Sequence, residues 1–291
     1  MEDGWQVTAQ DINQWTKTNH RRAQETLPRL IRNLILASSK PILLDIPVGD
    51  SISTGGWDGH LIVDEGNIFV PAGESFWEFG TEQNINKKAG DDYQKRTINP
   101  PQNSDKRNSS FIFATSRTWK KRNEWEKKKN DEGQWEKVKE INADNLAAWL
   151  EQCPAIHRWF ARLIGKRPNG AWDIEEAWAS WINATQPACN ADLALAGRQN
   201  EEKKLIDKLK EKPSLIRIFG ESENEAYAFS LASISRHIEF SSRLLVVRDS
   251  EAWDVLLDSQ QQLIIIPEFR NPTNFGLVSR QHLSVVKHKT Y

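Results

Sequence analysis

Two acidic residues and a lysine are spaced in this chain so that they could perform hydrolytic chemistry. Asp58 directly follows a tryptophan, and so does Glu78, twenty residues later; Lys88 then stands where a polar helix is expected to begin. Carboxylates on neighbouring strands are the ligands that a hard divalent cation prefers. A cation held in this way activates water, and a lysine near it can balance charge on a phosphodiester.

The two acids can meet only if the segments that carry them pair as strands. Alternation predicts one strand over 57–63 and a second arm over 67–70 that continues over 75–80, with a turn at 64–67. Strict pairing about that turn would place Asp58 opposite Gly73 instead of Glu78. The prediction therefore requires a bulge or bend between Pro71 and Glu74.

The surrounding segments predict an alternating α/β unit. A long helix, kinked at Pro28, is expected over 8–37. A second helix, over 85–96, should bury positions 85, 89 and 93. Its residues Lys88, Asp92 and Arg96 should then form a polar stripe. A loop is expected over 98–110. Further strands are predicted at 41–46, 111–115 and 135–141, and further helices at 143–150 and 155–164. The predicted order is helix, three strands, helix, two strands, helix.

This order, with the two acids, resembles the PD-(D/E)xK restriction-endonuclease-like superfamily, and in particular its Mrr-like branch, over residues 5–165. The resemblance implies that Asp58 and Glu78 hold Mg²⁺ or Mn²⁺. The family places a lysine two residues after the glutamate, where this chain has Gly80. Relatives tolerate a lysine that has moved to the following helix, so the resemblance makes Lys88 the catalytic candidate, with Lys87 behind it.

Other residues could assist this site, although each of them also has a simpler structural interpretation. Glu25 could add a carboxylate from the first helix or be a solvated residue, and His60 could touch the site or pack in the core. Asp92 and Arg96 could assist from the polar stripe. Asp58 could equally close a turn, and Glu78 could be an ordinary outward strand residue.

Composition narrows the class of protein. The 291 residues are enough for two domains. No apolar run reaches the length of a membrane span, and the N-terminus does not read as a signal peptide. With only two cysteines, a reducing cytoplasm is the expected compartment. The thirteen tryptophans are expected to lie mostly in the core.

Charge is distributed unevenly along the chain although its net value is −1. Between Asn84 and Asn130 there are thirteen Lys or Arg residues against five Asp or Glu residues. Such a segment can be a solvated face or a surface for phosphates. Its position after the two acids favours the phosphate-binding interpretation.

The second half predicts another α/β unit, with helices at 200–210, 226–235 and 253–257. Strands are expected at 215–219, 244–247 and 263–267, in a parallel sheet. Gly197-Arg198 before this unit resembles the start of a STAND-type P-loop NTPase. The phosphate loop is degenerate, because 220–226 contains three glutamates and no Lys-Ser/Thr pair, so no nucleotide-binding residues are predicted.

These observations predict a nuclease-like domain at 1–165, a linker with a short helix at 166–190, and a degenerate P-loop-like domain at 191–291. The resemblance implies a Mg²⁺-dependent endonuclease that cleaves DNA in anti-phage defence, regulated by the second domain. The alternative is a non-catalytic module on the same fold that binds nucleic acid or protein. A homo-oligomer is compatible with this assignment, and we expect a C-terminal sensor region, because the chain ends before the later elements of such a fold.

Overall fold

The computed structural model describes residues 6–48, 56–101, 104–166, 170–184, 188–212, 214–257, 262–268 and 288–289. Contacts between residues divide the chain into two compact units. One unit contains residues 7–151, and the other contains 152–291 together with 1–6. The division falls before helix α6 (Pro154–Leu163), which belongs to the second unit.

A five-stranded mixed sheet forms the centre of unit 7–151. Its order is β1 (Pro41–Asp45), β2 (Gly59–Val63), β3 (Gly73–Gly80), β4 (Ser109–Thr115) and β5 (Lys137–Ile141). The first three strands pair antiparallel, whereas β3, β4 and β5 run parallel. Because β3, β4 and β5 are parallel, their carboxyl ends lie at one edge of the sheet.

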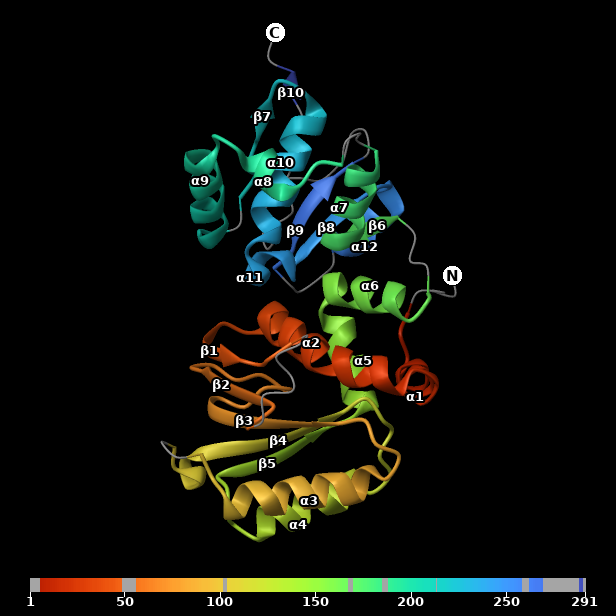
Figure 1. Cartoon of the computed structure of the whole chain (residues 1–291), viewed down its shortest axis with the longest axis vertical. Helices are drawn as coiled ribbons and strands as arrows, with labels where there is room; N and C mark the ends of the chain where they lie inside the picture. Colours follow the sequence, from red (N-terminus) through yellow and green to blue (C-terminus); the bar gives the residue numbers. More distant parts are fainter. Residues whose placement is uncertain are drawn as a thin grey trace. The chain divides into compact units, whose positions relative to one another are not determined.

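Helices cover both faces of this sheet. They are α1 (Ala9–Thr18), α2 (His20–Ser38), α3 (Ile85–Ile98), α4 (Arg122–Asp131) and α5 (Ala143–Gln152), with a short 3-10 turn at Lys106–Asn108. Figure 1 shows α3 and α4 together on one side of the strands, and α1, α2 and α5 on the other. The prediction of an α/β fold with a mixed sheet flanked by helices is confirmed.

The prediction of one long first helix is wrong. The break lies at Asn19, whose φ of −130° and ψ of 48° leave the helical region and separate α1 from α2. A capping box of Thr8 and Asp11 starts α1. Pro28 lies inside α2 without ending it, because the buried apolar stripe on either side keeps this helix packed.

The hairpin reaches the required register without the predicted bulge. Pairing runs from Val63 opposite Gly73 to Gly59 opposite Trp77. The predicted strand over 67–70 does not form; instead, residues 64–72 make one longer connection, in which the Asn67 side chain accepts hydrogen bonds from the N–H groups of Phe69 and Val70. Lengthening the connection shifts the pairing, because Val63 now lies opposite Gly73 instead of Ile68.

Aromatic side chains fill the space between the sheet and helices α3 and α4. Phe76, Phe111 and Phe113 point from the strands, and tryptophans at 119, 125 and 135 close the cluster. Four of these residues are less than 5% exposed. Helix α4 was not predicted, because its lysine-rich sequence buries only Trp125 and so carries a weak periodic signal.

The second unit contains a three-stranded sheet of order β6 (Ala171–Asp173), β8 (Leu244–Val247) and β9 (Ile264–Pro267). The parallel pair β8–β9 was predicted, but β6 is antiparallel to β8, so the sheet is mixed. Of the strand predicted at 215–219, only β7 (Phe219–Gly220) forms, paired with β10 (His288–Lys289). The helices of this unit are α6, α7 (Ile174–Asn183), α8 (Ala191–Leu195), α9 (Gln199–Lys210), α10 (Glu223–Ser235), α11 (Ile238–Ser241) and α12 (Ser250–Leu257).

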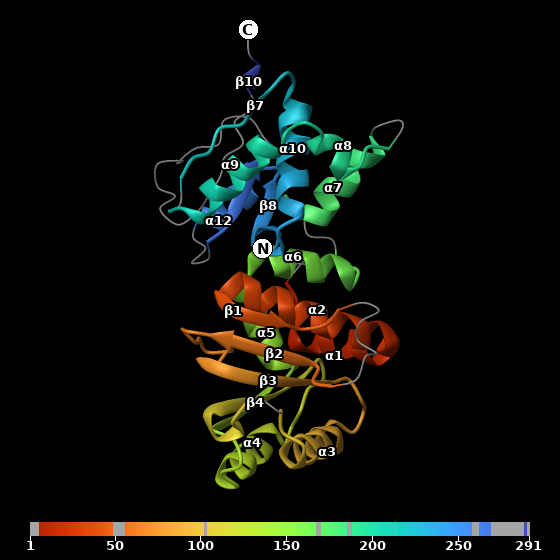
Figure 2. The same ribbon diagram turned by 60° about the vertical axis from the view of Figure 1, so that its left-hand side comes forward.

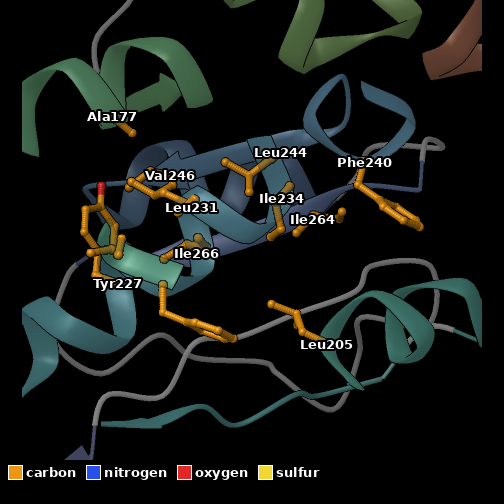
Figure 3. Packing of buried hydrophobic residues seen from close by; sticks show 14 of the residues in the cluster. Ala177, Leu205, Tyr227, Leu231, Ile234, Phe240, Leu244, Val246, Ile264 and Ile266 are labelled. Carbon is orange, nitrogen blue, oxygen red and sulfur yellow. The ribbon is translucent and has the colours of Figure 1, made fainter. Parts of the chain in front are cut away.

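Helix α10 is the centre of packing in the second unit. It contacts α7, α8, α9 and α11, and Figure 2 shows it alongside β8. Leu231 and Ile234 of this helix meet Leu244, Val246 and other side chains of the two parallel strands (Figure 3). The neighbouring residues in β8, Leu245 and Val247, pack into a second cluster on the opposite face. Burial of both faces explains why β8 reads as a continuous apolar run.

Within the described residues, no helix combines the length and the apolar character that crossing a bilayer requires.

Candidate active site

The strand register brings Asp58 and Glu78 together. Gly59 pairs with Trp77, so the next residue on each strand is Asp58 on one and Glu78 on the other. The Asp58 carboxylate accepts a hydrogen bond from the N–H of Phe79 at 2.8 Å. Strand alternation places Glu78 on the same face as Phe76, which packs under α3.

Glu78 is a buried acid with an elevated proton affinity. Only 3% of its surface is exposed. The pKa of its carboxyl is raised to about 7, chiefly by burial and in addition by the negative charges of Asp58 and Asp92. Arg96 Nε donates to Glu78 Oε1 at 2.5 Å and opposes this effect only in part. The charge of Asp58 thus acts on Glu78, and a bound cation would relieve the repulsion between the two carboxylates.

Gly80 and Lys88 fit together in space. A Cβ on Gly80 would lie 3.1 Å from Cγ of Lys88 and 2.7 Å from Cζ of Phe113. The aliphatic stem of Lys88 therefore lies against the position from which a side chain at residue 80 would start. Only glycine leaves this space, so a side chain at residue 80 and the stem of Lys88 could not both keep these positions.

The ammonium group of Lys88 is held by Asp92, one helical turn later. Lys88 Nζ lies 2.9 Å from Asp92 Oδ2, and Asp92 is 7% exposed. Burial by itself would lower the pKa of Lys88, but the hydrogen bond that Lys88 donates to Asp92 and the charges of Asp92, Glu82 and Asp58 outweigh it, so this pKa is raised. Lys88 is therefore charged at neutral pH. Asp92, predicted as an accessory, does reach the site.

Arg96 joins helix α3 to both acid-bearing strands. Besides its bond to Glu78, its guanidinium donates to the carbonyl of Gly56 and stacks over the Trp57 ring, with Cζ 4.7 Å from the ring centroid. These contacts hold the residues just before Asp58. The polar stripe expected on α3 thus faces the ends of β2 and β3.

Glu82 is a member of the cluster that the sequence analysis missed. Its Oε2 lies 3.1 Å from the position of a Gly80 Cβ, and within the described part of the chain this buried oxygen has no hydrogen-bond partner. Its charge acts on Lys88 and Asp92. The available signal was weak, because Glu82 lies beyond the end of β3, where strand alternation no longer predicts direction.

Three other candidates have different surroundings. Glu25 is exposed on α2 and pairs with Arg21 at 3.3 Å, which matches the solvated alternative. Lys87 is exposed on α3. His60 Nε2 lies 2.8 Å from Glu74 Oε1, and its ring stacks on Phe76 at 4.5 Å, so it packs on the sheet instead of reaching the carboxylates.

The residues present suit a magnesium ion whose ligands come only in part from protein. In the described part of the chain, no group of three or more His, Cys, Asp or Glu side chains is arranged to hold a metal. Magnesium is, however, commonly held by one or two carboxylates, with water and substrate phosphate completing the shell. Asp58 and Glu78 are the two carboxylates that could hold such an ion; among the described residues Asp58 forms no ion pair, whereas Glu78 is paired with Arg96.

In the second unit, a glutamate in the first turn of α10 closes the loop that precedes this helix. The Glu225 carboxylate accepts a hydrogen bond from the N–H of Glu221 at 2.7 Å and contacts the guanidinium of Arg198. A Cβ on Gly220 would lie 3.3 Å from Glu225 Oε2. An internal carboxylate thus lies at the helix N-terminus, where a phosphate would bind in a P-loop.

Comparison with known proteins gives no match among family models, curated proteins or solved structures.

Proposed function

We propose that residues 7–151 form a metal-dependent nuclease that hydrolyses phosphodiester bonds in DNA. The observation that carries the proposal is the neighbouring position of Asp58 and Glu78 at the ends of β2 and β3, with the stem of Lys88 against Gly80. The lysine that the motif lacks in sequence is supplied in space from α3. The observed order of strands and helices supports the same assignment to the restriction-endonuclease-like superfamily.

Each side chain has a distinct role in this proposal. Asp58 and Glu78 would hold Mg²⁺ or Mn²⁺, which when bound supplies Lewis acidity toward water and phosphate. Lys88, kept charged by Asp92, places a positive charge where negative charge builds on the phosphate in the transition state. Arg96 holds the two carboxylates in register through Glu78 and Gly56.

Cleavage of plasmid and linear duplex DNA, with and without Mg²⁺ or Mn²⁺, tests the proposal. Asp58→Asn, Glu78→Gln and Lys88→Met keep side-chain volume and remove charge, and each is expected to lower cleavage at least 100-fold. Glu65→Gln, on the exposed hairpin connection, is the matched control and should cleave like the parent. Equal cleavage by the parent and the Asp58 and Glu78 variants would refute the assignment.

A non-catalytic nucleic-acid-binding role is the second candidate, and one observation favours it. Arg96 already neutralises Glu78 at 2.5 Å in a buried position. If this pair does not open, the second carboxylate is not free for a cation. Under this alternative, DNA binding is retained, no divalent cation is bound, and no DNA is cut. Isothermal titration with Mn²⁺ separates the two candidates without a cleavage assay.

We further propose that the second unit regulates or assembles the first without binding nucleotide, as in degenerate STAND-type proteins of anti-phage defence. The Glu225 carboxylate at the start of α10 supports this proposal, because it lies where a nucleotide phosphate would be needed.

A further inference from the structure

Helix α3 carries a second lysine on the same face as Lys88, at residue 95. Seven residues separate the two, which corresponds to about 20° less than two full turns and a rise of about 10.5 Å. Lys95 is exposed in the last turn of the helix. Within the described chain no ion pair involves Lys95, whereas Lys88 is paired with Asp92.

The surroundings of Arg96 fix where Lys95 lies. Arg96 is the next residue, and its guanidinium binds Glu78 and the carbonyl of Gly56. This turn of α3 is therefore held against the segment that leads to Asp58.

We propose that α3 is the surface along which one strand of DNA lies, with Lys88 at the scissile phosphate and Lys95 at a phosphate farther along the same strand. The inference rests on the proposed nuclease function and assigns its substrate path. A rise of about 10.5 Å along α3 matches the rise of about three base pairs along the duplex axis, at about 3.4 Å for each phosphate of one strand. Because Lys95 is exposed and forms no ion pair with the residues that the structure describes, it can bind a phosphate without breaking a salt bridge among them.

The matched control is Lys87, which is equally exposed on the same helix. It precedes Lys88 by one residue and so points about 100° away from the Lys88–Lys95 face. Loss of Lys87 removes the same charge from the same element. An effect on DNA binding that is seen for Lys95 and not for Lys87 therefore depends on the position of the lysine and not on the net charge of the helix.

The experiment is fluorescence anisotropy of a labelled 20-base-pair DNA bound to the full chain in EDTA, between 50 and 200 mM KCl. Lys95→Ala is expected to reduce the slope of log Kobs against log salt by about 0.9, which corresponds to about eightfold weaker binding at 0.1 M. Lys95→Arg should restore the slope, and Lys87→Ala should leave it unchanged. Circular dichroism confirms that each variant is folded.

Three results would overturn the inference: no binding by the parent chain, an unchanged slope for Lys95→Ala, or an equal loss for Lys87→Ala. Failure of the nuclease proposal looks different. In that case the parent binds DNA with the Lys95-dependent slope, but adding Mg²⁺ or Mn²⁺ gives no cleavage. If cleavage occurs, Lys95→Ala should raise KM for DNA and leave kcat within twofold of the parent.

Discussion

Replacing Gly80 with alanine should affect both the stability of unit 7–151 and the position of Lys88. The added Cβ would lie 2.7 Å from Cζ of Phe113, a distance that requires one of the two groups to move. Phe113 is fully buried, with ring centroids of Trp119 and Trp125 at 5.9 and 6.2 Å. Overpacking of this kind costs about 1–3 kcal/mol.

Urea denaturation of the full chain measures the cost. With a denaturant dependence of about 2 kcal/mol per M, the transition of this unit should move down by about 0.5–1.5 M. Gly80→Ala combined with Phe113→Leu removes the tip of the ring and should recover part of the loss beyond additivity. The coupling between the two substitutions is the signature of a direct clash.

Cleavage by the folded variant tests the role of the lysine. The same Cβ lies 3.1 Å from Cγ of Lys88, so the lysine stem must give by a few tenths of an ångström. Since a displacement of about 1 Å in a catalytic group can cost about 100-fold in rate, this smaller shift should lower cleavage by a smaller factor. Parent-like stability of Gly80→Ala would refute the packing argument. Reduced stability with an unchanged cleavage rate would refute the role of Lys88.

Four further predictions concern residues outside the two acids. Gly90→Ala should stabilise α3 by about 0.5–1 kcal/mol in urea denaturation, because nothing lies within 4 Å of the new Cβ; a loss of stability would contradict this. Burial raises the pKa of Glu140 to about 7, so its contribution to stability falls as pH rises from about 4.5 to 7. Glu140→Gln should remove that part of the pH dependence, and an unchanged profile would argue against it. Burial lowers the pKa of His157 to about 4, so stability from this residue rises with pH between about 4 and 6.5 and is lost in acid; His157→Leu should flatten the profile over that range, with a change of about 2–3 kcal/mol as the upper limit. Calorimetric titration with ATP should give no binding, because the Glu225 carboxylate occupies the start of α10; tight binding would contradict this reading of the loop.

Element types along unit 7–151 could largely be predicted from sequence, since most strands and helices carry a clear apolar period. The exceptions have physical causes. Asn19, and not Pro28, separates α1 from α2, because a proline that is buried in a packed helix is tolerated. In the second unit, the strand predicted at 215–219 forms only at its last residue, since apolar alternation does not guarantee a pairing partner.

Within the candidate site, the sequence identified Asp58 and Glu78 as neighbours and required a bulge or bend between Pro71 and Glu74, where the structure has a longer connection with a bend at Ala72 before a regular strand. Register depends on where the connection between two strands begins and ends, and the side-chain bonds of Asn67 that shape this connection are not visible in an apolar pattern. Glu82 was missed for a similar reason, because it lies just beyond a regular strand. Lys95 lies seven residues after Lys88, and this spacing was visible in the sequence. It becomes informative only when the structure shows that this face of α3 approaches Asp58.

The sequence by itself determined which chemical groups are available: two strand-borne carboxylates, a lysine-bearing helix after them, and a second-unit loop too acidic for a phosphate. Only the tertiary structure decided that the stem of Lys88 lies against Gly80 and that Arg96 is bound to Glu78. The reason is that periodicity reports which face of an element is buried, whereas contacts between residues far apart in the chain depend on register and on the depth at which each helix packs.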